Sequence, residues 1–170
     1  MKHKAMTRDS GKLRDRDDRT GGGRDSARPA SGFGLSGEED KMTNTTGTKI
    51  RGDWVSLVQD LCGTIESWAR ERKWFVHREE KTITEEHLGS YAVPVLLIQA
   101  GQGRIHVEPI GRNIIGAEGR IDISSFPSLN RMLLIRVNGR WVLRTDSGVD
   151  WPDHWSKKAF VNLVRALTAD

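Results

Sequence analysis

Apolar residues recur every three or four positions in the segment that follows Asp53. This spacing places one broad apolar stripe along an amphipathic helix. Asp53 can cap that helix, because a carboxylate accepts hydrogen bonds from the free amides of the first turn. The pattern predicts a helix from residue 53 to about residue 72. Its stripe consists of Trp54, Val58, Leu61, Ile65 and Trp68, flanked by Val55, Cys62 and Ala69.

The middle of the chain changes to the two-residue period and the β-rich composition of strands. Within the second of the predicted strands, Pro94 favours an edge position or a bulge. The pair Asn138-Gly139 separates two β-rich runs and is a strong hairpin signal, because both turn positions need a positive φ. Strands are predicted over residues 73–84, 90–100, 104–110, 120–124, 131–137 and 140–145.

The segment SKKAFVNLVRALTA at residues 156–169 returns to helical spacing. Ser156 is its predicted N-cap, and Phe160, Leu163, Val164 and Leu167 form its apolar face. The connections between strands are too short for helical crossovers. The sequence therefore predicts an α+β fold with an N-terminal helix, a mostly antiparallel sheet of five to six strands in meander order, and a C-terminal helix packed on the sheet.

Two of the predicted strands are apolar at consecutive positions, VPVLLI at 93–98 and RMLLIRV at 131–137. Such runs are typical of strands that are buried on both faces. Two helices on one face could not cover both sides of the sheet. Either the helices divide between the faces, or another chain covers the second face. We favour a protein partner or self-association, with a homodimer as one form of it.

The first 48 residues differ in composition from the rest of the chain. They are rich in Gly, Ser, Thr, Arg and Asp, with ten basic and eight acidic residues and few large apolar ones. Such a segment buries too little surface to offset its chain entropy, so we predict a disordered mixed-charge tail over residues 1–48. All six tryptophans follow it. Residues 49–170 are long enough to form one domain with its own core.

Charge and cysteine content narrow the class of protein. The chain has 27 basic and 23 acidic residues, a net charge of +4, with no basic stripe of the kind that nucleic-acid binders show. No run approaches 18 apolar residues, so no membrane association is expected. We expect no secretory signal, because no apolar run follows the first charged residues. The single cysteine, Cys62, is predicted to be an inert core thiol, and a cytoplasmic location is expected.

The stretch TDSGVDWPDHW at 145–155 concentrates charged and aromatic residues. Its aspartates do not follow the calcium-loop order, and a zinc site would need a second His or Cys nearby. We therefore expect neither a metal nor a cofactor, and interpret the stretch as a turn whose tryptophans cover the open end of the sheet. If it binds a ligand, Trp151 and Trp155 would form the walls, with Asp146, Asp150 and His154 as polar contacts.

A second candidate site comes from strand parity in the predicted third and fourth strands. If these strands pair, five polar side chains stand together on one face: Arg104, His106, Glu108, Arg120 and Asp122. Cross-strand charge pairs on a surface explain such a group without any ligand. The alternative is a polar groove for an anionic or zwitterionic ligand, with Arg112 or Arg120 as a bidentate clamp.

The segments GRIDI and MLLIRVNG resemble the metal-binding strand pair of the PD-(D/E)XK nucleases. The resemblance implies that Asp122 would be a magnesium ligand. Arg136 stands where that family has a glutamate, and Asn138 stands where it has a lysine. Because two of the three residues differ, an active nuclease of this type is not predicted.

Glutamates also gather around the first predicted turn, at Glu79, Glu80, Glu85 and Glu86, with His87 beside them. Two close carboxylates can bind a metal or perform acid–base catalysis. Charge runs between strands are more typical of solvated turns, which is our interpretation here.

These observations leave three functional hypotheses. The first is a small cytoplasmic binding or interaction module without its own catalytic activity. The alternative is a hydrolase-like enzyme with a polar site around His106, Glu108, Arg120 and Asp122. The third is a weak nucleic-acid binder that uses the tail together with hairpin arginines 136, 140 and 144.

Overall fold

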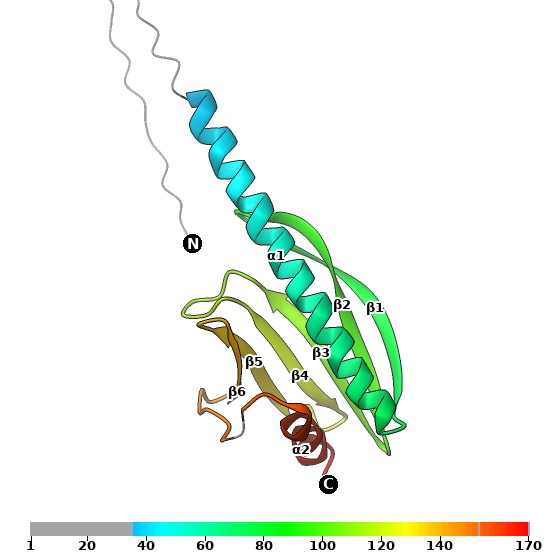
Figure 1. Ribbon diagram of the computed structural model, residues 1–170. Coiled ribbons are helices and arrows are strands. Elements are labelled where there is room, and N and C mark those ends of the chain that lie inside the picture. Colours follow the sequence, from blue (N-terminus) through cyan, green and yellow to red (C-terminus); the bar gives the residue numbers. More distant parts are fainter. Residues whose placement is uncertain (1–35, 153, 170) are drawn as a thin grey trace, which may run out of the picture. The chain divides into compact units, whose positions relative to one another are not determined.

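The computed structural model describes residues 36–152 and 154–169, with side chains from residue 45 onward. A long helix, α1 (Ser36–Glu71), precedes a six-stranded sheet, and a short helix, α2 (Lys157–Thr168), follows it (Figure 1). All neighbouring strands are antiparallel, in the order β1-β2-β3-β4-β5-β6. The predicted α+β meander is confirmed. The strands are β1 (Phe75–Glu85), β2 (Gly89–Ala100), β3 (Gly103–Gly111), β4 (Arg120–Phe126), β5 (Arg131–Val137) and β6 (Arg140–Thr145).

Local signals set the hairpin and the last helix as predicted. Asn138 and Gly139 have φ values of 49° and 72° and join β5 to β6 in a two-residue turn. Ser156 has extended backbone, and its hydroxyl oxygen accepts a hydrogen bond from the backbone N–H of Ala159 at 3.2 Å. Both features follow from short-range chemistry, which explains why sequence alone located them.

Helix α1 begins at Ser36 rather than near Asp53, so residues 36–48 of the predicted tail are helical. This stretch is rich in Thr and Gly, which are weak helix formers, and it has no apolar stripe. Just after this stretch, Arg51 Nη1 of α1 donates a hydrogen bond to the carbonyl oxygen of Leu88 in the β1–β2 turn at 3.1 Å. Helical periodicity does not predict this contact, because its two residues lie 37 positions apart in sequence. The rest of the predicted tail, residues 1–35, lies outside the described residues.

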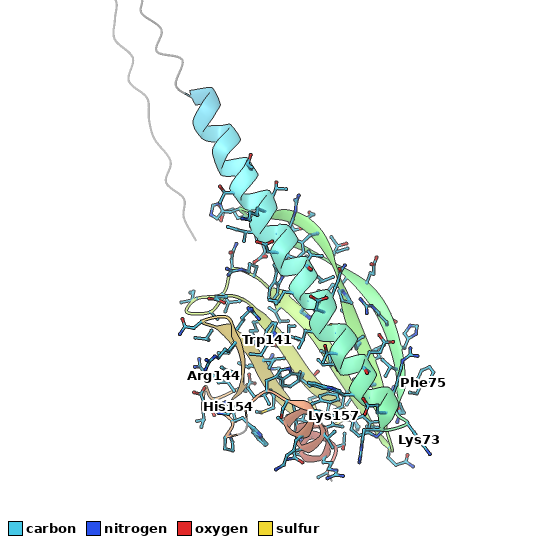
Figure 2. The ribbon with its side chains drawn as sticks, in the orientation of Figure 1. Lys73, Phe75, Trp141, Arg144, His154 and Lys157 are labelled. Carbon is cyan, nitrogen blue, oxygen red and sulfur yellow. The ribbon has the colours of Figure 1, made fainter. Side chains whose placement is uncertain are left out.

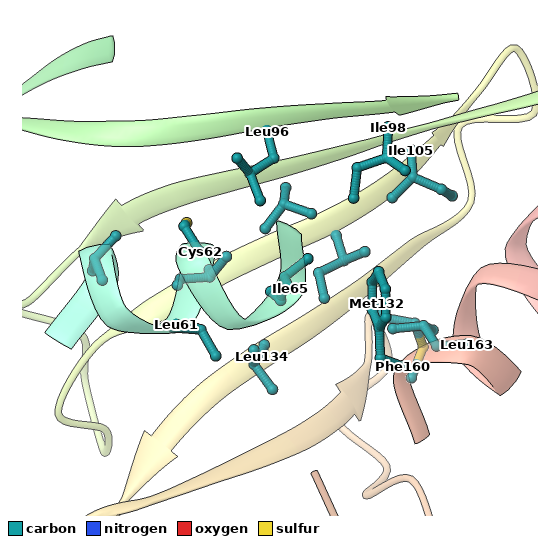
Figure 3. Packing of buried hydrophobic residues seen from close by; sticks show 14 of the residues in the cluster. Leu61, Cys62, Ile65, Leu96, Ile98, Ile105, Met132, Leu134, Phe160 and Leu163 are labelled. Carbon is teal, nitrogen blue, oxygen red and sulfur yellow. The ribbon is translucent and has the colours of Figure 1, made fainter. Parts of the chain in front are cut away.

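Both helices pack on the same face of the sheet. Leu61, Cys62 and Ile65 of α1 and Phe160 and Leu163 of α2 belong to one buried cluster that includes side chains of every strand (Figure 3). The idea that the helices divide between the two faces is therefore wrong. Cys62 is fully buried, as predicted, and this burial raises the pKa of its thiol to about 12.

The apolar run in β2 has a second explanation in the course of that strand. Val93 and Leu96 both belong to the core cluster, although side chains three positions apart in a regular strand point to opposite faces. The positions that point to the core therefore change from odd to even numbers near Pro94. Pro94 pairs with Glu80 of β1, whereas the pairing of β2 with β3 begins only at Leu96. Pro94 thus lies where β2 has one neighbour, as its missing N–H predicted.

Four aromatic rings pack together where α2 meets the end of α1: Trp68, Trp74, Trp155 and Phe160. The ring centroid of Trp155 lies 5.7 Å from that of Trp68 and 6.1 Å from that of Phe160. Trp68 and Trp74 also contact Phe160, with centroids 6.0 and 6.1 Å away. Tilted and edge-on pairs at these distances are favourable beyond their buried area. The C-terminal helix is therefore held by aromatic side chains from both ends of the domain sequence.

Candidate functional site

The opposite face of the sheet, which neither described helix covers, is called the open face below. The strand register aligns its side chains in rows that cross the sheet. One row runs through Phe75, Gln99, Arg104 and Phe126, and the next runs through His77, Leu97, His106 and Ser124. Three apolar side chains in these rows are exposed to solvent: Phe75 by 70%, Leu97 by 38% and Phe126 by 51%.

These two rows form a groove of about 410 Å³, called the Arg104 groove below. The guanidinium carbon of Arg104 lies 4.5 Å from the ring centroid of Phe126, a cation–π distance. None of the described residues that line the groove carries a carboxylate. Its lining comprises Phe75, His77, Leu97, Ile98, Gln99, Arg104, Ile105, His106 and Phe126. Of the five polar residues predicted to share this face, Arg104 and His106 lie in it.

The carboxylates of the open face lie in the next row, where Glu108 of β3 stands opposite Asp122 of β4. The strands pair as the parity argument assumed, so the predicted polar side chains do share one face. Lys81 Nζ lies 2.6 Å from Glu108 Oε1, and His106 Nδ1 lies 3.8 Å from Glu108 Oε2. Lys81 and Glu108 thus link β1 to β3, whereas Glu108 and Asp122 stand opposite one another as two acids.

Asp122 is the more enclosed of these two acids, with 7% of its surface exposed. Arg120 Nε and Nη2 donate to its two oxygens at 2.6 and 2.9 Å, and Arg131 Nη1 approaches at 3.4 Å. Arg131 also donates to Asp146, at 2.7 Å from Nη2 to Oδ1, and this hydrogen bond lowers the pKa of Asp146. Both oxygens of Asp122 are therefore engaged by guanidinium groups.

Arg112 does not join this group. Its side chain lines a separate pocket of about 250 Å³ together with Asp53, Trp54 and Arg136. Of the two arginines considered as a clamp, Arg112 therefore lies apart from the polar group, and Arg120 is engaged by Asp122.

Glu85 corrects the interpretation of the glutamate run as solvated turns. Its carboxylate accepts hydrogen bonds from the backbone N–H groups of Arg112 at 3.1 Å and Asn113 at 2.7 Å, and from the hydroxyl of Tyr91. Burial, followed by the hydrogen bond to Glu85, raises the pKa of Tyr91. Glu85 thus ties β1 to the β3–β4 loop. Its two backbone donors lie 27 and 28 positions away in sequence, so no local signal could have revealed them.

The remaining glutamates of that run are surface residues. Glu79 and Glu80 lie exposed in the middle of β1, within a strand and not in a turn, whereas Glu86 and His87 are exposed in the β1–β2 turn. Among the described residues, no three His, Cys, Asp or Glu side chains come together in a group that could hold a metal ion.

The stretch TDSGVDWPDHW folds back along the free edge of β6. The backbone N–H of Thr145 donates to the carbonyl of Val149, and the N–H of Trp151 donates to that of Leu143, both at 2.8 Å. Asp150 pairs with Arg144 while Asp146 pairs with Arg131, so the two acids point to different partners. The geometry agrees with the interpretation of the stretch as a structural turn.

The two tryptophans and the histidine of this stretch take different positions. Trp151 and Trp155 are partly buried against the core. His154 is exposed and lines a groove of about 570 Å³ beside Arg140 and Trp141. His154 and Arg144 lie at the β6 end of the domain, on the side remote from Phe75 (Figure 2). These residues therefore cannot act together with the Arg104 groove.

The hairpin arginines do not form a continuous basic stripe. Arg136 lies over the ring of Trp141, 5.5 Å from its centroid, and 3.6 Å from Glu118. Arg144 is paired with Asp150. Arg140 alone of the three is exposed.

Comparison of the chain with models of protein families, with curated proteins and with solved structures found no match. In the described part of the chain, neither helix combines the length and the apolar character needed to cross a membrane.

Proposed function

We propose that this protein is a non-catalytic interaction module whose open sheet face binds another protein. The observation that carries the proposal is the placement of both helices on one face, which leaves Phe75, Leu97 and Phe126 exposed on the other. Exposed apolar side chains that gather on one surface mark interaction sites more often than scattered ones do. The single buried cysteine agrees with a reducing compartment such as the cytoplasm.

The dimensions of the open face suit a protein contact. Six strands about 4.8 Å apart, from six to twelve residues long and about nine on average, cover roughly 29 by 30 Å, or about 870 Å². A standard interface buries about 800 Å² on each partner. The open face is therefore large enough for one partner, and it mixes apolar and charged side chains as such interfaces do.

The hydrolase-like alternative draws less support from the same geometry. A general acid or base must reach a substrate proton with an available oxygen. The oxygens of Asp122 are engaged by Arg120 and Arg131, and Glu108 is paired with Lys81. The carboxylates of this face are better suited to holding strands together than to proton transfer.

The test compares two immobilised baits, the full chain and the triple variant Phe75→Ser/Leu97→Ser/Phe126→Ser. Proteins retained by the first bait but not the second are purified and titrated against both by calorimetry. We expect at least one purified partner to bind the triple variant ten-fold or more weakly. A full set of partners with equal affinity for both baits would overturn the proposal. Circular dichroism and thermal unfolding check that the variant remains folded.

A further inference from the structure

We infer that the Arg104 groove binds a short segment of a partner protein in which apolar side chains stand next to a carboxylate. This inference rests on the proposed function and adds the chemistry of the ligand.

The shape of the groove fits an extended segment of a few residues. Phe75 of β1 and Phe126 of β4 stand at its two ends in the same row, with Leu97 in the next row between them. Four strands at about 4.8 Å spacing place these ends roughly 14 Å apart. An extended peptide covers that distance with about four residues. Apolar side chains of such a peptide would contact the rings of Phe75 and Phe126 and the side chain of Leu97.

The charge of the groove favours an acidic neighbour for those apolar side chains. Arg104 is exposed, and among the described residues it contacts the ring of Phe126 and no carboxylate. A guanidinium stacked on a ring keeps the N–H groups of its edge free for a bidentate bond to a carboxylate. His77 and His106 also line the groove, and each has a ring nitrogen beside a glutamate, at 3.2 and 3.8 Å. Their acidic neighbours, Glu79 and Glu108, lie one row away from the groove.

A second copy of this chain suits the groove less well. Homodimers are most often two-fold symmetric, with the same patch on both subunits. A two-fold axis through the groove would bring Arg104 of one copy against Arg104 of the other, with no carboxylate in either groove. Like charges at an interface oppose association. A segment of a different protein that carries acidic residues is the better complement.

The experiment uses two fluorescein-labelled peptides with the same apolar core, Asp-Leu-Phe-Asp-Leu and Lys-Leu-Phe-Lys-Leu, titrated by anisotropy into the full chain. We expect the acidic peptide to bind at least ten-fold more tightly than the basic one. The variant Arg104→Glu should reverse that preference. The matched control Lys158→Glu makes the same charge change at an exposed position of α2 and should leave the preference unchanged.

Four outcomes would overturn the inference. Equal binding of the two peptides would do so, as would an unchanged preference in Arg104→Glu. A dimer of the full chain in light scattering that Arg104→Glu abolishes would show that a second copy occupies the groove. If neither peptide binds while the triple variant still loses a purified partner, the ligand chemistry inferred here is wrong and the proposed interaction function stands.

Discussion

The two faces of this sheet follow different rules although the same strands form them. The covered face consists of aliphatic side chains that meet both helices with almost no exposed surface, as at Ile105 and Ile121. On the open face, exposed aromatic rings stand beside ion pairs such as Arg120–Asp122. The comparison indicates that the covered face supplies most of the stability, whereas exposed side chains of the open face, such as Phe75, can change at little cost to folding.

The same substitution on the two faces tests this division, and the larger effect is expected on the covered face. Phe160→Ala removes a fully buried ring that contacts Trp68, Trp74 and Trp155. Truncation of a buried phenylalanine costs about 3–5 kcal/mol, because the cavity that remains is only partly filled by relaxation. Urea unfolding monitored by tryptophan fluorescence measures the loss. A loss below about 1 kcal/mol would show that α2 contributes little to the core.

Cys62 reports on the same face through its reactivity. Its pKa is about 12 instead of 9.0, a difference of three pH units, so its thiolate is about 1000-fold rarer than that of an exposed cysteine at pH 8. Iodoacetamide should therefore modify the native chain far more slowly than the urea-unfolded chain. The contribution of the buried, neutral Cys62 thiol to the free energy of unfolding is fully present below pH 9 and is lost as the pH rises toward 12. Rapid alkylation of the native chain would contradict this burial.

Loss of the ion pairs of Asp122 on the open face should reduce the free energy of unfolding by an intermediate amount. Asp122→Ala removes the acceptor of Arg120 and leaves that guanidinium, which is 26% exposed, without its partner. An enclosed group that loses its hydrogen-bond partner costs about 1–3 kcal/mol. Chemical denaturation of Asp122→Ala and Asp122→Asn checks the value. Retained binding of the purified partner by folded Asp122→Asn is also expected, since Asp122 does not line the Arg104 groove.

Sequence reasoning succeeded where short-range chemistry decides the structure. The Asn138-Gly139 turn, the Ser156 cap and the alternation of β3 and β4 each depend on neighbouring residues, and each is present. The predicted start of α1 was wrong because the helix continues before Asp53 without an apolar stripe. In this part of the helix, Arg51 contacts the β1–β2 turn.

The candidate site was harder to predict for a similar reason. Parity placed His106 and Glu108 on one face, but the groove also needs Phe75 and Phe126, which join it through the register of four strands. Nothing local to Phe75 marks it as part of a site. The separation of the two helices from the open face was equally hidden, because an apolar stripe does not show which face of a sheet it will cover.

Glu85 is a polar residue whose hydrogen bonds stabilise the fold. Glu85→Gln weakens three hydrogen bonds to the carboxylate and should lower the free energy of unfolding by about 1–2 kcal/mol. Glu86→Gln, next to it in the exposed turn, is the matched control and should change stability by less than about 0.5 kcal/mol. Thermal and urea unfolding of the pair provide the measurement. Equal effects at the two positions would remove the assigned role of Glu85.

The smallest effect on stability is expected from Phe75→Ala, the counterpart of Phe160→Ala on the open face. Phe75 is 70% exposed and projects from the edge of the sheet (Figure 2), so its truncation should change the free energy of unfolding by less than about 0.5 kcal/mol. Binding of the acidic peptide should nevertheless weaken at least three-fold, because the ring forms one end of the Arg104 groove. Urea unfolding and anisotropy titration on the same samples separate the two quantities. If stability and binding change together, or if neither changes, the two faces do not divide these tasks. A loss of binding alone, at a position that folding barely uses, would show that the open face is maintained for recognition.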